Sequence, residues 1–321
     1  MSTSPEPATP AAQRATTDHV TAPQTFSEVD YPALFLSADE ASKRGQERYI
    51  LLTRLEVVFI ICSAALGALI SVLAFIGPAV GGTRIVAAVS GSLLIGAALV
   101  RSVARSTQPT GKWFEGRAVA ESTKSLAWLY MMRVEPFNVP TPQADGAFVD
   151  ALRGVLGERP AVSQPIRSHE NSQLEQITPA MGLVRRLPFH QRRTAYEKLR
   201  LNDQLSWYSS RSVMLRRGND RAFVVGIIFE VLALGSAMAL IAFPTGPNLI
   251  GVFAVTTAAA TTLSRLRGDT EVADRYALAA QELSMIRGRL QLASEQQFPE
   301  SVKDAEAAIS REHKMWAAKR N

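Results

Sequence analysis

Cysteine and histidine are scarce in this 321-residue sequence, which excludes several kinds of site. The one cysteine, Cys62, cannot form an intrachain disulfide or a cysteine-based metal centre. The four histidines (His19, His169, His190 and His313) lie far apart, without the spacing of metal ligands. The sequence also has no glycine-rich phosphate loop and no nucleophile elbow. We therefore expect a protein that is not an enzyme and that binds no cofactor or metal ion.

The start of the chain has little hydrophobic character. Residues 1–30 lack a basic start followed by an apolar run, so no cleavable signal peptide is predicted. Serine, threonine, proline and alanine dominate this segment, and such a composition cannot bury a core. We predict a disordered N-terminal tail over residues 1–30.

Long apolar runs are what the sequence does contain. Val57–Val80 has no charged residue, and about 20 apolar helical residues are enough to cross a bilayer. A second run, Ile85–Val100, is extended by the flanking Arg84 and Arg101, whose guanidinium groups can reach the membrane surface. These runs predict spanning helices at about 57–80 and 84–104. The alternative is a buried hairpin in a soluble core, but soluble helices of this length usually carry a polar stripe.

The same arrangement occurs again later in the chain. Ala222–Phe243 is followed by a Pro/Gly-containing turn and by Asn248–Ser264, which predicts spanning helices at about 222–243 and 247–264. The predicted fold is an all-α membrane protein with tandem duplicated two-span hairpins, four spanning helices in total, and long cytoplasmic helices.

Proline-rich and polar stretches suggest the domain boundaries. The first two-span domain is predicted at 31–156, followed by a linker at 157–180 that is rich in proline, serine and glutamine. The second domain is predicted at 181–298. A basic helix at 299–321 ends the chain, and we expect it to be exposed.

The distribution of basic residues predicts the orientation in the membrane. The formal net charge is +6, and lysine and arginine cluster outside the hairpin turns, of which only the first contains a basic residue, Arg84. By the positive-inside rule, both termini and the segment between the hairpins are cytoplasmic in a multi-pass protein of the plasma (inner) membrane. Membrane lipids are therefore the expected partners, and no nucleic acid is expected.

One acidic residue, Glu230, lies midway along the third predicted span. A charge at the bilayer centre costs roughly 2.5–3.5 kcal/mol or more, so such residues usually face a bundle interior or water. One interpretation is a carboxylate that lines a pore or responds to protons. The other is a protonated carboxyl group hydrogen-bonded to a hydroxyl of the fourth span, for which the candidates are Thr256, Thr257 and Thr261. Those threonines also suit close helix packing or a polar pore wall.

A heptad pattern follows the second hairpin. Its apolar positions are Val272, Tyr276, Ala279, Leu283, Ile286 and Leu290. Their alternating spacings of four and three are typical of a coiled-coil seam. The seam pairs either with another helix of the same chain or with a second subunit of a homo-oligomer.

Two polar and aromatic segments flank the hairpins on the cytoplasmic side, as candidates for packing or sensing. The first contains Trp113, Arg117 and Glu121. The second contains Tyr196, Arg200, Asp203, Gln204, Trp207 and Tyr208. Core packing is the favoured role for the Trp-Tyr pair, with ligand contact as the alternative.

With these segments and the hairpin plan, the chain resembles the bacterial two-transmembrane effector domains called SLATT, which accompany SMODS nucleotidyltransferases and SLOG sensors, and the related DUF4231 proteins. Two such domains in tandem would cover most of the chain. The resemblance implies an effector in a nucleotide-signalled conflict or anti-phage system, oligomeric and pore-forming or membrane-perturbing, with a nucleotide-sensing or nucleotidyltransferase partner. The alternative is a membrane-anchored scaffold that binds a partner through its cytoplasmic coiled-coil helices and conducts nothing. A transporter is disfavoured because the two hairpins are neither inverted nor broken.

Overall fold

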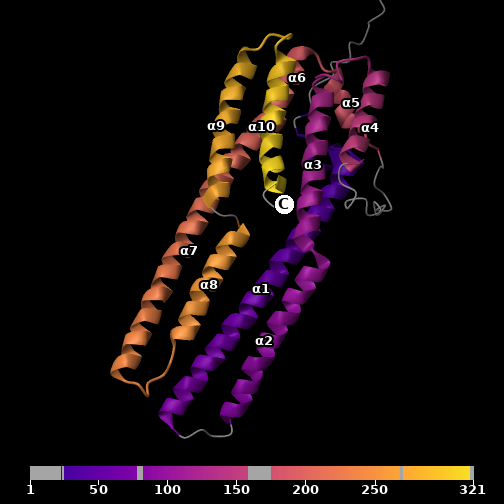
Figure 1. Cartoon of the computed structure of the whole chain (residues 1–321). Helices are drawn as coiled ribbons and strands as arrows, with labels where there is room; N and C mark the ends of the chain where they lie inside the picture. Colours follow the sequence, from indigo (N-terminus) through magenta and orange to yellow (C-terminus); the bar gives the residue numbers. More distant parts are fainter. Residues whose placement is uncertain (1–22, 24, 78–81, 158–174, 268–269, 319–321) are drawn as a thin grey trace, which may run out of the picture.

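The computed structural model describes residues 23, 25–77, 82–157, 175–267 and 270–318, and this part of the chain is helical and contains no strand. Its elements in chain order are η1 (Glu28–Asp30), α1 (Ala33–Ile76), α2 (Gly82–Thr107), α3 (Pro109–Met131), α4 (Thr141–Gly157), α5 (Pro179–Arg186), α6 (Phe189–Tyr196), η3 (Glu197–Leu201), α7 (Asn202–Ala242), α8 (Ile250–Arg267), α9 (Thr270–Leu292) and α10 (Phe298–Ala318). Figure 1 shows two regions. The hairpins α1–α2 and α7–α8 extend in one direction, and the remaining helices form a bundle around the starts of α1 and α7.

Two helices run through both regions. α1 has 44 residues and α7 has 41, which at 1.5 Å per residue makes each about 60–65 Å long. This is about twice the ~30 Å thickness of a bilayer's hydrocarbon core. Each helix is therefore long enough to cross a membrane and to continue for several turns in the bundle.

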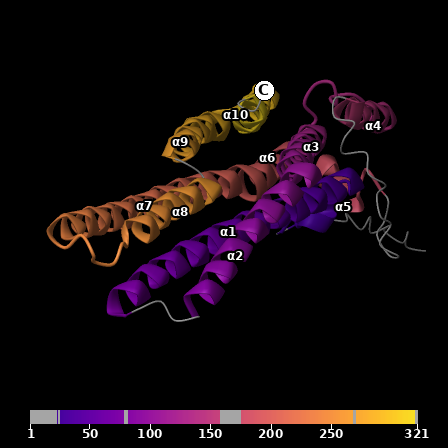
Figure 2. The same cartoon turned by 60° about the horizontal axis from the view of Figure 1, so that its bottom comes forward.

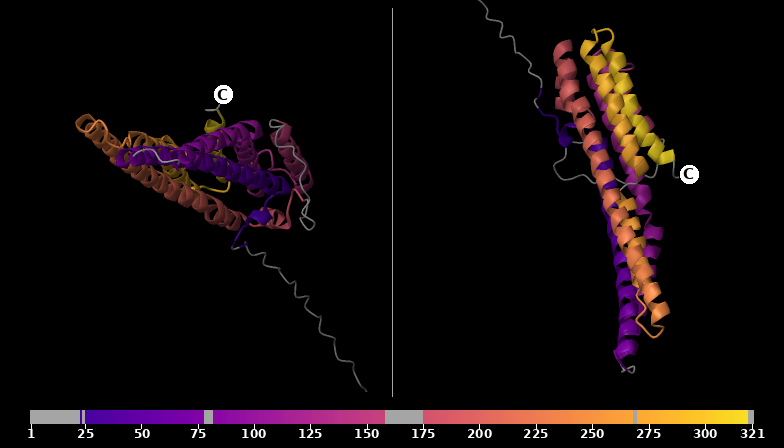
Figure 3. Two further views of the ribbon diagram at one scale, coloured as in Figure 1. Left: turned by 90° about the horizontal axis from the view of Figure 1, so that it is seen from below. Right: turned by 90° about the vertical axis from the view of Figure 1, so that its left-hand side faces the viewer.

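The hairpin helices lie side by side in the order α7, α8, α1, α2, which we call the helix layer. α7 packs on α8, α8 packs on α1, and α1 packs on α2. Figure 2 shows the same order from another direction, and the side view in Figure 3 shows the hairpins extending away from the bundle. α7 and α2 are thus the edges of the layer, and both of its faces are apolar and exposed. Along the whole of α2, for example, only Ala97 is buried.

Among the described residues, three helical segments are long and apolar enough to cross a membrane: Ala33–Ile76, Gly82–Met131 and Phe189–Ala242. The sequence predicted four spans. The fourth, α8, has 18 residues and contains four threonines and two arginines, so it is less apolar than the others. It nevertheless lies within the helix layer, between α7 and α1.

Helix α1 meets α3 at nearly direct backbone contact. A Cβ atom added to Gly116 would lie 2.8 Å from the carbonyl oxygen of Ala38, and one added to Gly45 would lie 2.7 Å from the backbone nitrogen of Trp113. The Ser42 hydroxyl donates a hydrogen bond to the Trp113 carbonyl oxygen, and the two oxygens lie 3.0 Å apart. Glycine on both facing helices therefore sets the spacing between α1 and α3.

The heptad face of α9 is buried within the chain. Val272, Tyr276, Leu283, Ile286 and Leu290 are each at most 8 % exposed, and α9 packs between α7 and α10. In the structure, this seam therefore pairs with helices of the same chain.

The last helix differs from the prediction. α10 was expected to be exposed, but it packs against α9 and α3 and buries Phe298, Val302, Ala305 and Ile309. These residues recur at spacings of four, three and four, which defines one helix face. The charged residues between them obscured this pattern in the sequence.

The start of the described chain also differs from the prediction. Residues Glu28–Asp30 of the predicted disordered tail form η1, and the Phe26 ring lies 5.4 Å from that of Trp128. The rest of the predicted tail, at 1–22 and 24, lies outside the described residues, as does most of the predicted linker, at 158–174. The end of that linker is ordered, because Thr178 caps α5 and donates to the Asp30 carbonyl at 2.6 Å.

Both halves of the chain follow one plan. A long helix (α1 or α7) packs against its hairpin partner (α2 or α8) and against the helix that follows (α3 or α9). This repetition agrees with the predicted duplication. α10 then bridges the halves by packing on both α9 and α3.

Candidate functional site

A fully buried ion pair lies at the centre of the bundle. Arg200 of η3 donates to Glu306 of α10 through Nε at 3.0 Å and through Nη2 at 2.8 Å, and the two side chains are only 1 % and 3 % exposed. Burial alone lowers the pKa of Arg200, but the charge and hydrogen bonds of Glu306 outweigh it and raise that pKa above its usual value. The guanidinium therefore stays charged, and it is held in a bidentate geometry.

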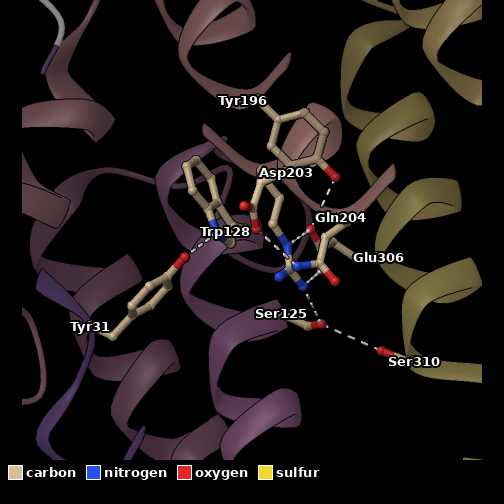
Figure 4. A network of polar contacts seen from close by, with 9 residues as sticks. Tyr31, Ser125, Trp128, Tyr196, Asp203, Gln204, Glu306 and Ser310 are labelled. Carbon is tan, nitrogen blue, oxygen red and sulfur yellow. Dashed lines mark hydrogen bonds and ion pairs between the residues drawn. The ribbon is translucent and has the colours of Figure 1, made fainter. Parts of the chain in front are cut away.

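Neighbouring hydroxyl groups extend this pair into a network that links three segments of the chain. Tyr196 at the end of α6 donates to Glu306 at 3.0 Å. On the other side, Arg200 Nη2 lies 3.5 Å from the Ser125 hydroxyl of α3, which lies 3.5 Å from that of Ser310. Figure 4 shows Tyr196, Glu306 and Ser125 converging from their separate helices. We call Ser125, Tyr196, Arg200 and Glu306 the buried network.

A π-helical turn positions the arginine. Residues Glu197–Leu201 form η3, a single wide turn between α6 and α7. Such π-turns inside α-helices occur frequently at functional sites. Burial raises the pKa of Tyr196 well above its usual value, so its hydroxyl keeps the proton that it donates to Glu306.

An aromatic and cationic cluster adjoins the network. Trp128 donates from its indole nitrogen to the Tyr31 hydroxyl at 2.9 Å, as Figure 4 also shows. The ammonium of Lys124 lies 5.2 Å from the centre of the Tyr31 ring and 5.6 Å from that of Phe35. Burial, and then the charge of Arg200, lower the pKa of Lys124. Lys124 and Arg200 thus lie close enough for their charges to interact, and Glu306 is the buried counter-ion of Arg200.

The structure brings the two predicted cytoplasmic segments together. The Arg117 guanidinium of α3 lies 5.7 Å above the Trp207 ring of α7 and 3.8 Å from the Glu121 carboxylate. Tyr208 is buried, and its ring lies 5.5 Å from that of Tyr276 on α9. Core packing is therefore the observed role of Tyr208.

The remaining predicted cytoplasmic residues lie around this contact. Gln204 is buried and donates to Asp203 at 3.3 Å. Trp113 lies further along α3, with its ring 4.7 Å from that of Phe114 and 6.0 Å from that of Tyr49. Sequence reasoning missed Glu306, Ser125, Lys124 and Tyr31. For Glu306, the available signal was its place beside the apolar face of α10.

In the helix layer, Glu230 is exposed on α7, at an edge of the layer. The threonines that were its proposed partners donate elsewhere: Thr256 to Val252 O at 2.8 Å, Thr257 to Gly226 O at 3.4 Å and Thr261 to Thr257 O at 3.1 Å. Their hydroxyls thus satisfy backbone carbonyls of α7 and α8.

Two further polar contacts, which the sequence did not predict, join α1 to α2. Glu56 accepts from Arg101 Nε at 2.7 Å, at the end of the hairpin next to the bundle. Deeper in the hairpin, the hydroxyls of Ser63 and Ser90 lie 2.9 Å apart. These contacts fix the register of the two helices. Among the described residues, no group of three or more His, Cys, Asp or Glu could hold a metal ion.

Family models match the two halves of the chain in turn. The model of SMODS and SLOG-associating 2TM effector domain 3 (SLATT_3) matches residues 32–193, and that of domain 1 (SLATT_1) matches residues 196–316. The chain belongs to the SLATT family. This confirms the predicted pair of tandem domains. No curated protein and no solved structure matches the chain.

The two SLATT domains meet at residues 193–196, next to the buried network. Tyr196, Arg200 and Glu306 belong to the second domain, whereas Ser125 and Trp128 belong to the first. The network therefore lies at the interface of the two SLATT domains. Any rearrangement between the domains would have to break or move these contacts.

Proposed function

We propose that this SLATT protein is a non-enzymatic membrane effector that assembles from several chains and opens or perturbs the membrane after a cytoplasmic cue. Family membership and the apolar helices indicate association with a membrane. The finer proposal has three parts: four spans, a polar edge that another chain covers, and a bundle that controls the spans.

The topology that we propose is multi-pass, with α1, α2, α7 and α8 all spanning the inner membrane. α8 lies between α7 and α1, so a membrane that surrounds these two helices must also contain α8. Basic residues cluster where the helices leave the layer toward the bundle, for example Arg101, Arg217 and Arg265. The positive-inside rule then places the bundle and both termini in the cytoplasm.

The observation that carries the proposal is the exposed Glu230 at the edge of the helix layer. Four helices in a single layer enclose no path of their own. A lipid-facing carboxylate midway along a span costs roughly 2.5–3.5 kcal/mol or more. A second chain packed against α7, or a water-filled path between chains, would remove that cost. This supports an oligomer in which Glu230 faces a neighbouring chain or a pore.

The long helices α1 and α7 suggest how a cue reaches the membrane. Each is continuous from the bundle into the layer, and the buried network lies at the start of α7. A cue that separates the two domains would therefore move the first turns of α7, and the continuous helix would transmit that motion. We propose a nucleotide-sensing or nucleotidyltransferase partner as the source of the cue.

The alternative is a membrane-anchored scaffold that binds a partner through the coiled-coil face of α9 and conducts nothing. That face is already covered by α7 and α10, with Leu283 fully buried. The scaffold model would need it to be free. The exposed carboxylate in the layer favours the conducting model.

The test is membrane potential in bacteria that express the protein, followed with a voltage-sensitive dye. We expect rapid depolarisation that Glu230→Ala weakens. Thr262→Val is the matched control, because Thr262 is exposed on α8 and its hydroxyl donates to the Ala258 carbonyl of its own helix, at 2.9 Å. Equal depolarisation by all three proteins, at equal membrane levels, would refute the role of Glu230.

A further inference from the structure

A cavity opens between α7 and α8 where the helix layer meets the bundle. Its volume is about 610 Å³, within the roughly 300–1,000 Å³ typical of small-molecule sites. The described residues that line it belong to α7 and α8. The hydroxyl of Ser264 on α8 donates to the side-chain oxygen of Asn219 on α7 at 2.6 Å, so the two helices are fixed to each other at this level.

The polar part of the cavity is cationic. Arg217 and Arg221 line it and are exposed. Within the described part of the chain, neither arginine forms an ion pair. Their neighbour Arg216 is different, because it points to α9 and pairs with Asp274 at 2.7 Å. The carboxylate of Asp220 does not line the cavity, so two cations face it without a carboxylate from α7.

The part of the cavity beyond the arginines is apolar. Ala222 and Val225 of α7 and Ala260 and Leu263 of α8 line this part. These residues lie within the predicted spans, whereas the arginines lie at their cytoplasmic end. On the bundle side of the arginines, Val213, Met214 and Leu215 also line the cavity. The two charges therefore lie between apolar surfaces at the cytoplasmic end of the predicted spans, which is the depth of lipid headgroups.

We propose that this cavity binds an anionic phospholipid, with the phosphate at Arg217 and Arg221 and the upper acyl chain along Val225 and Leu263. Basic pockets between spanning helices on the cytoplasmic side suit such headgroups. The inference rests on the proposed insertion of α7 and α8 but not on conduction. A protein that binds the lipid and conducts nothing would refute the pore and leave this site intact.

Native mass spectrometry of the full-length protein in detergent tests the site, with equal amounts of phosphatidylglycerol and phosphatidylcholine added. We expect the wild-type protein to retain phosphatidylglycerol preferentially. The double variant Arg217→Gln/Arg221→Gln should bind it about 30-fold more weakly, because each basic residue near a membrane surface contributes about fivefold to the affinity for anionic lipid. Arg217→Lys/Arg221→Lys, which keeps both charges, should retain most of the binding and shows whether substitution at these positions disturbs the fold.

Arg216→Gln is the matched control, because it removes the same charge one residue away but outside the cavity. The proposal fails if the Arg217→Gln/Arg221→Gln variant retains phosphatidylglycerol as well as Arg216→Gln does, or if phosphatidylcholine binds equally well. It also fails if glycerol phosphate at similar concentration displaces the lipid, since the site would then be one for a soluble anion.

Discussion

The buried pair Arg200–Glu306 gives the sharpest stability prediction. Glu306→Gln keeps the volume of the side chain and removes its charge, which leaves the Arg200 guanidinium buried without a counter-ion. Ser125, at 3.5 Å from Nη2, and Tyr196 offer only neutral oxygens in its place. Breaking a buried pair in this way costs about 3–5 kcal/mol.

Thermal unfolding of the detergent-solubilised protein, followed by tryptophan fluorescence, measures this cost. At roughly 2–4 °C per kcal/mol for a chain of this size class, the Tm of Glu306→Gln should fall by about 10 °C. The double variant Arg200→Met/Glu306→Leu should recover most of that loss, because replacing a whole buried pair by apolar residues is often neutral or stabilising.

The control is a pair on the surface of the same bundle. Arg289 of α9 and Asp304 of α10 lie 3.4 Å apart, but their side chains are 69 % and 44 % exposed. Asp304→Asn should therefore cost at most about 1 kcal/mol. If Glu306→Gln melts within a degree or two of Asp304→Asn, the central pair is not buried as described and the interdomain network is wrong.

Three further variants test the packing and the electrostatics of the bundle. Gly116→Ala should destabilise the protein by at least about 1 kcal/mol, because its Cβ would meet the Ala38 carbonyl oxygen at 2.8 Å. Gly154→Ala, whose Cβ would meet no atom within 4 Å, should instead stabilise it by up to about 1 kcal/mol. If both variants shift the Tm in the same direction, the close contact between α1 and α3 is contradicted. Lys124→Met should raise the Tm at neutral pH, because the lowered pKa of Lys124 means that the folded state disfavours the charged amine. The wild-type protein should then gain stability as the pH rises from the folded-state pKa of Lys124 toward the usual 10.5. The Tm advantage of Lys124→Met should therefore shrink over that range. A Tm difference between the two proteins that does not change with pH would contradict this reasoning.

The hairpins and the long helices could be predicted from the sequence because uncharged apolar runs are a local signal. The start of α1 could not, since it depends on a distant segment. The backbone nitrogen of Ala33 donates to Glu175 O at 3.1 Å and that of Leu34 to the Gln176 side chain at 3.3 Å, so the first turn is capped by residues far along the chain. The local sequence around Ala33 therefore gave no guide to the start of the helix.

The candidate site was predictable only in part, because it too depends on contacts between distant segments of the chain. Arg200 and Tyr196 stood out by their family-like context, but their partner Glu306 lies in a helix whose charged residues suggested exposure. Only the tertiary contact of α10 with α3 and α9 makes it a buried counter-ion. The order of helices in the layer, which makes α7 an edge and exposes Glu230, likewise depends on lateral contacts that no local pattern encodes.

Dye release from single liposomes, compared with the number of labelled chains counted in each, tests the central claim most directly. The claim is that one chain presents a helix layer and that several chains are needed for a path through the membrane. We predict that vesicles with one or two chains stay sealed and that release begins only when several chains are present. Release from vesicles that contain a single chain would contradict the account.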